Sequence, residues 1–173
     1  EYILELKDVV KKFGGVVALD HVHFKLRPGE IHALMGENGA GKSTLMSILF
    51  GSYDPDAGII KIRGKEVKIK DPNAATALGI GMVHQHFKLV HNYTVTENIV
   101  LGIESTKYGF LDIKTAEKRV EELSNKYGLM VNPKAKIEDI TVGMQQRVEI
   151  LKTLYRNADI IILDEPTTVL TPQ

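Results

Sequence analysis

One stretch decides the fold: Gly36-Glu37-Asn38-Gly39-Ala40-Gly41-Lys42-Ser43, or GENGAGKS. It satisfies G-x-x-x-x-G-K-[ST], the P-loop or Walker A pattern. Glycine permits positive φ and lets the backbone approach a phosphate, and successive N–H groups at a helix N-terminus form an anion-binding concavity. The apolar run Ile31–Met35 predicts a strand before the loop, and Lys42–Phe50 predicts a helix after it. Because a plain glycine-rich turn leaves this context unexplained, the sequence predicts a nucleotide-binding loop.

The loop supplies a second kind of polar group through its side chains. Lys42 adds a mobile cation for the β- and γ-phosphates, the Ser43 hydroxyl is placed to ligate Mg²⁺, and Thr44 is expected on the α-phosphate side. The residues predicted to bind the nucleotide are Gly36, Glu37, Asn38, Gly39, Ala40, Gly41, Lys42, Ser43 and Thr44.

Two acidic residues follow a uniformly apolar run near the end of the chain. Ile160–Leu163 is typical of a strand buried on both faces of a parallel sheet, and Asp164 and Glu165 come directly after it. Parallel strands end at one edge of a sheet, so we expect Asp164 to reach the Mg²⁺ and Glu165 to orient or deprotonate the attacking water. An acidic turn before Pro166 is the simpler alternative, which the P-loop disfavours.

Composition limits the function classes. The chain has 173 residues, 43% hydrophobic and 25% charged, which is ordinary for one globular domain with at most a small extra lobe. Equal numbers of basic and acidic residues, 22 each, give no excess charge for nucleic acid, and the absence of cysteine excludes disulfides and thiolate chemistry. No stretch approaches the roughly 20 apolar residues that span a bilayer. Because the sequence starts at Glu1 and stops at Gln173, we expect a fragment of a longer protein.

Antiparallel strands are predicted in the first half of the chain. Tyr2–Leu6 and Val22–Leu26 alternate as half-exposed strands do, and Gly64-Lys65 is expected to be a type II′ turn between Ile60–Arg63 and Glu66–Lys70. The basic side chains of this hairpin are interpreted as a solvated face and not a nucleic-acid surface, because no aromatics alternate with them. They are Lys61, Arg63, Lys68 and Lys70.

Helices dominate the second half. Ile80–His84 predicts a short strand, a helical pattern starts at Asp112 and stops at Gly128, and a second helix follows Thr141. Strands that alternate with helices predict an α/β fold. Three nearby histidines of the segment 84–91 are disfavoured as metal ligands, since no thiolate accompanies them. They are His84, His86 and His91.

The phosphate loop and the acidic pair are not the whole of the pattern, because the chain resembles the ATP-binding cassette (ABC) ATPase family across essentially its whole length. In this family a glutamine ends a core strand and senses the metal and the lytic water, and Gln85 stands at the corresponding place. An aromatic residue ahead of the first glycines usually stacks on adenine, and Phe13 before Gly14-Gly15 matches it. A plain core phenylalanine is the alternative for Phe13.

The family signature, usually Leu-Ser-Gly-Gly-Gln, corresponds to the segment 140–144 followed by Gln145. Thr141 keeps the hydroxyl and Gly143 keeps one glycine, whereas Val142 and Met144 depart from the pattern. The resemblance implies a second anion site at a helix N-terminus capped by Thr141, which faces the γ-phosphate held by another cassette. A bare helix cap is the alternative.

The resemblance also implies the rest of the machinery. The segment 166–171 is similar to the D-loop that contacts an opposing cassette, with Thr171 where Asp is usual, and the switch histidine is expected beyond Gln173. With the signature, this ending looks most like the first cassette of tandem ATPases of simple-sugar and nucleoside importers. The expected fold class is α/β: a P-loop NTPase core with a mostly parallel sheet, an antiparallel β subdomain and a helical insertion, truncated at the C-terminus.

The function implied is hydrolysis of ATP with Mg²⁺ to drive import of a simple sugar or nucleoside. Glu165, Gln85 and Lys42 are the expected catalytic residues, and Ser43, Gln85 and Asp164 the metal ligands. Residues 1–100 and 156–173 are expected to form the core with its β lobe, and 101–155 a helical subdomain.

Expected partners are a second nucleotide-binding domain, membrane permease subunits and a solute-binding protein, with no nucleic acid, at the cytoplasmic face of the membrane. The alternatives are a non-transport ABC ATPase that acts on nucleic acid or ribosomes, and a fragment that binds nucleotide without hydrolysing it.

Overall fold

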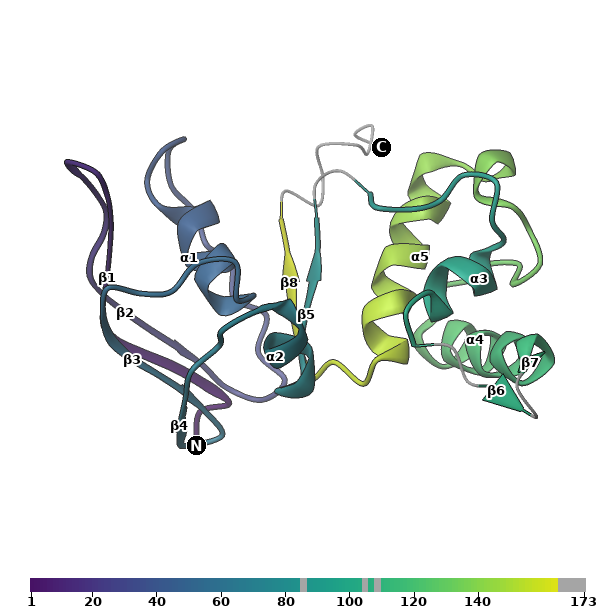
Figure 1. Ribbon diagram of the computed structural model, residues 1–173, viewed down its shortest axis with the longest axis horizontal. Coiled ribbons are helices and arrows are strands. Elements are labelled where there is room, and N and C mark those ends of the chain that lie inside the picture. The colour runs from purple at the N-terminus through teal and green to yellow at the C-terminus, as the bar shows by residue number, and fades with distance from the viewer. Residues whose placement is uncertain (85–86, 104–105, 108–109, 165–173) are drawn as a thin grey trace. The chain divides into compact units, whose positions relative to one another are not determined.

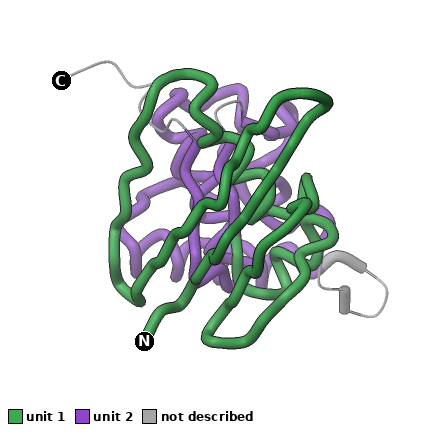
Figure 2. The backbone as a smooth tube through the Cα atoms, turned by 90° about the vertical axis from the view of Figure 1, so that its left-hand side faces the viewer, with its two compact units in different colours: residues 1–80 green, residues 81–173 purple. Residues whose placement is uncertain are grey.

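The structure, a computed structural model, describes residues 1–84, 87–103, 106–107 and 110–164. The chain divides into two compact units, Glu1–Ile80 and Gly81–Gln173, which Figure 2 colours separately. Each unit contains its own buried apolar residues, and each is described by itself below.

Unit 1 is built on a four-stranded antiparallel sheet in the order β2-β1-β3-β4 (Figure 1). Its strands are β1 (Leu4–Phe13), β2 (Val16–Leu26), β3 (Ala57–Ile62) and β4 (Lys65–Val67). Leu6 pairs with Phe24 on one side and with Ile60 on the other, so β1 is central. The prediction of antiparallel strands near the N-terminus is confirmed. They are longer than the alternating pattern indicated, because bulges interrupt the alternation in β1.

Two helices complete unit 1. Helix α1 (Lys42–Leu49) buries Leu45, Ile48 and Leu49, and it ends before Gly51, as the sequence predicts. Helix α2 (Pro72–Ala77) was not foreseen. Its start is set by Asp71, whose carboxylate accepts a hydrogen bond from the backbone N–H of Ala74 at 2.8 Å, with Pro72 in the first turn.

The turn between β3 and β4 corrects the predicted hairpin. Ile62 pairs with Lys65, so the two turn residues are Arg63 and Gly64, one position earlier than expected. Both have positive φ, 49° and 76°, which is a type I′ and not a type II′ turn. The type I′ turn matches the right-handed twist of the strands, and this outweighs the modest cost of a left-handed arginine. Ile60 pairs with Val67, so these two apolar side chains share a face of the sheet.

The strand expected before the phosphate loop does not form. Residues 31–37 have no regular secondary structure, and the side chains of Ile31 and Met35 are 99% and 88% exposed. A strand buried on both faces is stable only with hydrogen-bonding neighbours. Within the described part of the chain, this segment pairs with no other strand.

Unit 2 is mainly helical. Its helices α3 (Val95–Val100), α4 (Ile113–Tyr127) and α5 (Val142–Tyr155) are joined by the short hairpin β6 (Thr106–Lys107) and β7 (Phe110–Leu111) and by a single 3₁₀ turn, η1 (Ile137–Asp139). The three helices share one apolar core. Its buried members are Val95, Ile99, Val100, Ala116, Val120, Ile137, Val148, Leu151 and Tyr155.

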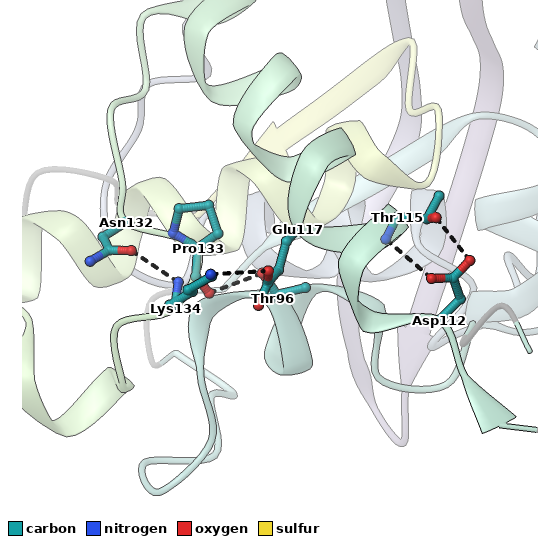
Figure 3. A network of polar contacts seen from close by, with 7 residues as sticks. All are labelled: Thr96, Asp112, Thr115, Glu117, Asn132, Pro133 and Lys134. Atoms are coloured by element: carbon teal, nitrogen blue, oxygen red, sulfur yellow. Dashed lines mark hydrogen bonds and ion pairs between the residues drawn. The ribbon is translucent and has the colours of Figure 1, made fainter.

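The two predicted helices of unit 2 are confirmed. Asp112 caps α4 by accepting from the Thr115 N–H at 3.2 Å, and Gly128 ends it with a φ of 66°. Figure 3 shows this cap together with the contacts that hold the segment after α4. There Thr96 of α3 donates its hydroxyl to the carbonyl of Pro133 at 2.9 Å, and Lys134 pairs with Glu117 of α4 at 3.7 Å.

A two-stranded sheet pairs β5 (Ile80–Val83) with β8 (Ile160–Leu163). The N–H of Asp164, the residue after β8, donates to the carbonyl of Val83 at the end of β5 at 3.1 Å. The two strands therefore run parallel and end at the same edge, as the apolar run at 160–163 predicts. The side chains of Ile160 and Ile162 are buried, whereas Ile161 is half-buried and Leu163 is 40% exposed, so the strand is not buried on both faces as predicted.

Candidate functional site

The phosphate loop is an exposed turn between the irregular segment 31–37 and α1. Gly39 and Gly41 adopt φ of +84° and +89°, whereas Gly36 lies outside the left-handed region. Gly41 also packs against the edge of β2: a Cβ there would lie 2.5 Å from the carbonyl oxygen of Ala18 and 2.9 Å from Leu19 Cδ2. Glycine at position 41 is therefore required twice, by conformation and by space.

Lys42 folds back over this loop. Its Nζ donates to the carbonyl oxygens of Gly36 at 2.6 Å and Glu37 at 2.7 Å. A third hydrogen bond, from the Ala40 N–H to the Glu37 carbonyl at 3.2 Å, closes the turn. The ammonium group is therefore held at the loop that the sequence assigns to phosphate binding, where it can exchange carbonyl oxygens for phosphate oxygens.

The first turn of α1 carries no side-chain cap. Gly41 occupies the N-cap position, and it has no side chain that could accept from the first N–H groups of the helix. Such N–H groups bind anions, and the helix dipole adds to the attraction. The side chain of Ser43 is exposed at this end and that of Thr44 is half-buried. Backbone donors, one cation and one hydroxyl thus converge in unit 1, which is chemistry that fits a polyphosphate.

Phe13 is an exposed ring and not a core residue. It lies at the end of β1, where it pairs with Val16, and its side chain is 42% exposed. The ring meets Tyr53 edge to face at 5.1 Å between centroids, and Lys11 Nζ lies 5.4 Å from its centre. Tyr53 was not singled out from the sequence. An aromatic two residues after the glycine that ends α1 was the cue that could have found it.

The phosphate loop and Phe13 belong to the same end of unit 1. Gly41 contacts β2 at Ala18 and Leu19, and Leu19 pairs with Lys11, two residues before Phe13 in β1. Strand residues rise about 3.3 Å each, so the ring lies within a few residues of the loop along the sheet. This separation suits a base on the ring and phosphates on the loop.

The edge of the β5–β8 sheet carries Asp164 and His84. Burial lowers the pKa of His84, and the nearby Lys88 ammonium lowers it further, whereas the carboxylates of Glu149 and Asp164 act in the opposite direction. Asp164 therefore stands at a strand end among titratable groups. Gln85, Glu165 and the segment 166–171, which carry the predicted sensor, base and D-loop, lie outside the described residues.

The predicted signature lies at the start of α5. Thr141 caps the helix, as expected, by accepting from the Met144 N–H at 3.3 Å, and Val142 and Met144 are exposed. The Gln145 side chain turns back: its Nε2 donates to the carbonyls of Ile137 at 3.3 Å and Ile140 at 3.5 Å. Gln145 thus anchors the helix start to the preceding segment, while Thr141 to Met144 form its tip, which is exposed except for the half-buried Gly143.

Two features of the described residues bear on metals and membranes. Within residues 1–84, 87–103, 106–107 and 110–164, no group of three or more His, Cys, Asp or Glu side chains could hold a metal ion. His86 lies outside them. Across the same described residues, none of the helices has the length and apolar character needed to cross a bilayer.

The chain is similar in sequence to curated import ATP-binding proteins. A guanosine import ATP-binding protein, NupO of Bacillus subtilis, is 59% identical over 172 residues, which are 99% of this chain and 34% of that protein. A ribose import ATP-binding protein, RbsA 1 of Rubrobacter xylanophilus, is 46% identical over 98% of this chain and 34% of its own length. The chain therefore spans about a third of the length of the curated relatives it matches.

The fold also matches solved structures. The ADP conformation of MJ1267, an ATP-binding cassette of an ABC transporter, superimposes with a TM-score of 0.83 at 28% identity and covers 99% of this chain and 72% of that one. The model of the ABC transporter family matches residues 19–168, which include the phosphate loop, the signature and Asp164. On this match the chain belongs to the ABC transporter family.

Proposed function

We propose that the chain binds and hydrolyses ATP as a nucleotide-binding cassette that drives solute import through separate membrane subunits. The observation that carries the proposal is the phosphate loop: Lys42 Nζ sits 2.6 Å from the Gly36 carbonyl beside a helix start with no side-chain cap. The named activities of the relatives, import of guanosine and of ribose, support a nucleoside or a simple sugar as the solute.

Nucleotide binding is assigned to unit 1. The loop residues Gly36 to Ser43 and Thr44 would hold the phosphates through backbone N–H groups and the Lys42 ammonium. Phe13 would stack on the adenine, a role its exposed ring supports. Tyr53 braces that ring edge to face and so belongs to the proposed base site.

Mg²⁺ fits the oxygen donors that the chain offers. Mg²⁺ is usually bound through one or two carboxylates together with substrate phosphates, and the proposed protein ligands are the Asp164 carboxylate, the Ser43 hydroxyl and the Gln85 amide. The ion would neutralise charge on the phosphates. Glu165 would accept a proton from the attacking water, Gln85 would orient that water, and Lys42 would stabilise the charge of the γ-phosphate.

The exposed tip of α5 is assigned to a second nucleotide. Thr141, Val142, Gly143 and Met144 would face the γ-phosphate on another cassette, with Gln145 behind them as the anchor. The dimeric ADP- and Pi-bound cassette among the similar solved structures supports such pairing. We further propose membrane permease subunits and a solute-binding protein as partners, a peripheral position at the cytoplasmic face, and 101–155 as a helical subdomain inserted between 1–100 and 156–173.

Two substitutions test the proposed function in the full-length protein. Lys42→Ala should weaken ATP binding by at least about tenfold, because it removes the charged donor of the loop. Glu165→Gln should keep ATP affinity and lower the hydrolysis rate by about a hundredfold or more, because Gln cannot accept the proton. Titration calorimetry and phosphate release measure the two effects. Lys65→Ala, an exposed lysine of unit 1, is the matched control. Unchanged affinity in Lys42→Ala contradicts the proposal.

A further inference from the structure

Glu149 is a carboxylate buried in the middle of α5. Its residue is 5% exposed and stands next to Val148 and two residues before Leu151, both in the apolar core of unit 2. Burying a carboxylate is costly unless it is hydrogen-bonded. The Glu149 Oε1 accepts from the backbone N–H of Lys88 at 3.0 Å. This hydrogen bond, and not apolar packing, explains why a carboxylate side chain occupies a buried position.

The segment that Glu149 holds begins three residues after Gln85. A second buried side chain, Asn98 of α3, fixes the same segment from another helix: its Oδ1 accepts from the Val90 N–H at 2.7 Å and its Nδ2 donates to the carbonyls of Val90 and Thr94, both at 3.0 Å. Asn98 is 1% exposed. Lys88 to Val90 are therefore held by backbone bonds to α5 and α3, independently of their own side chains.

Helix α5 also holds the chain before Gln85. Gly81 of β5 packs so closely on α5 that an added Cβ would lie 2.8 Å from Thr153 Cβ. Thr153 and Glu149 are four residues apart, so they lie on one face of the helix, one turn from each other. A single helical face thus contacts β5 at Gly81 and the following segment at Lys88, on both sides of residues 85–86.

We infer that Glu149 is a positioning residue that fixes Lys88, three residues after Gln85, relative to the predicted signature at the start of α5. Glu149 is eight positions after Thr141, a rigid helical span of about 12 Å. If Gln85 orients the water and Thr141 meets a second nucleotide, as proposed above, then α5 both starts at Thr141 and holds Lys88, three residues after Gln85, and Glu149 is the link that transmits a shift between them. The expected effect on ATP hydrolysis rests on the proposed function, whereas the hydrogen bond between Glu149 and the Lys88 N–H does not.

The bond is tested by amide exchange at Lys88 in the full-length protein without nucleotide. Glu149→Ala should speed exchange of the Lys88 amide by about tenfold or more, because the acceptor is gone. Glu149→Gln keeps an acceptor oxygen at the same reach and should stay within about threefold of the wild type, whereas Glu149→Asp keeps the charge but is one methylene shorter and should lose protection. Lys88→Ala retains the N–H and should leave exchange near that of the wild type. Equal exchange in all variants overturns the inference, as does a Gln variant as exposed as the Ala variant.

The positioning role is tested by steady-state ATP hydrolysis of the same proteins. Glu149→Ala and Glu149→Asp should lower kcat by about tenfold with KM for ATP within about twofold, because the phosphate loop is untouched, and Glu149→Gln should restore kcat. Where Glu149→Ala fails to fold by circular dichroism, the Asp and Gln pair decides. Loss of Lys88 protection with an unchanged kcat overturns the role. A wild-type protein without ATPase activity would instead overturn the proposed function while leaving the exchange result intact.

Discussion

Gly41 takes a left-handed backbone, φ +89°, and a Cβ added there would lie 2.5 Å from the carbonyl oxygen of Ala18, whereas Gly39 has nearly the same φ, +84°, in open space. This pair separates conformational strain from steric exclusion. Gly39→Ala should cost about 1 kcal/mol of unfolding free energy, the strain of a left-handed alanine. Gly41→Ala should cost about 2–4 kcal/mol, since the Cβ would also displace β2. Denaturant unfolding of both variants measures the difference.

The prediction fails if Gly39→Ala and Gly41→Ala destabilise the protein equally. Equal destabilisation in the two variants would mean that β2 moves away from Gly41 without cost, and the contact between the loop and β2 would then not fix the phosphate loop. Gly15→Ala serves as the reference substitution, because an added Cβ at Gly15 meets no atom within 4 Å.

His84 predicts a pH dependence. Its pKa is lowered in the folded chain, so when the pH falls below the ordinary value of 6.5 the unfolded chain binds the proton first. The stability of unit 2 should therefore be complete above pH 6.5 and should fall as the pH drops from 6.5 to the lowered folded pKa. His84→Gln should lack this component. Unfolding midpoints of the wild type and His84→Gln between pH 7.5 and 5 measure this component. If both midpoints change in parallel with pH, His84 does not cause the pH dependence.

At the scale of elements, helix α3 is short and depends on its first turn. Thr94 and Glu97 form a capping box: the Glu97 N–H donates to Thr94 Oγ1 at 3.2 Å, and the Thr94 N–H donates to Glu97 Oε2 at 2.7 Å. Glu97→Ala should destabilise unit 2 by about 1 kcal/mol, because one N–H and the dipole interaction lose their partner.

Glu121 of α4 provides the control for that substitution. Its side chain is exposed, and Glu121→Ala should change the unfolding free energy by less than about 0.5 kcal/mol. The two variants remove the same charge and the same atoms from neighbouring helices of one unit. If they are equally stable in thermal unfolding, the capping box contributes nothing to α3.

Elements with local causes were predictable and elements with distant causes were not. Asp112 and Gly128 bound α4 where the sequence puts them, because a cap and a left-handed glycine act within one turn. The hairpin at Arg63-Gly64 was placed one residue late, since the register depends on the pairing of Ile62 with Lys65 across the strands. Ile31–Met35 has the composition of a buried strand, yet composition supplies no strand to pair with it.

At the scale of the whole molecule, the proposed function divides binding and hydrolysis between different parts. Gly143→Asp puts a negative charge at the exposed tip of α5, where another cassette's γ-phosphate is proposed to lie. In the full-length protein it should lower hydrolysis by about a hundredfold, while the ATP affinity of its own phosphate loop stays within about threefold. Phosphate release and calorimetry separate the two. A matching loss of affinity would mean that the tip acts on its own cassette's nucleotide.

The sequence by itself determined the phosphate loop, the apolar strand before Asp164, the capped helices α4 and α5, and the family. Those depend on residue type and spacing over a few residues, where glycine, proline, capping side chains and periodicity act directly. Only the tertiary structure decided that Phe13 is exposed beside Tyr53, that Lys42 bonds two loop carbonyls, and that Glu149 is buried against the Lys88 amide. A contact such as Glu149 to Lys88 joins residues 61 positions apart. Its free energy depends on the burial that the assembled core creates, which no local pattern encodes.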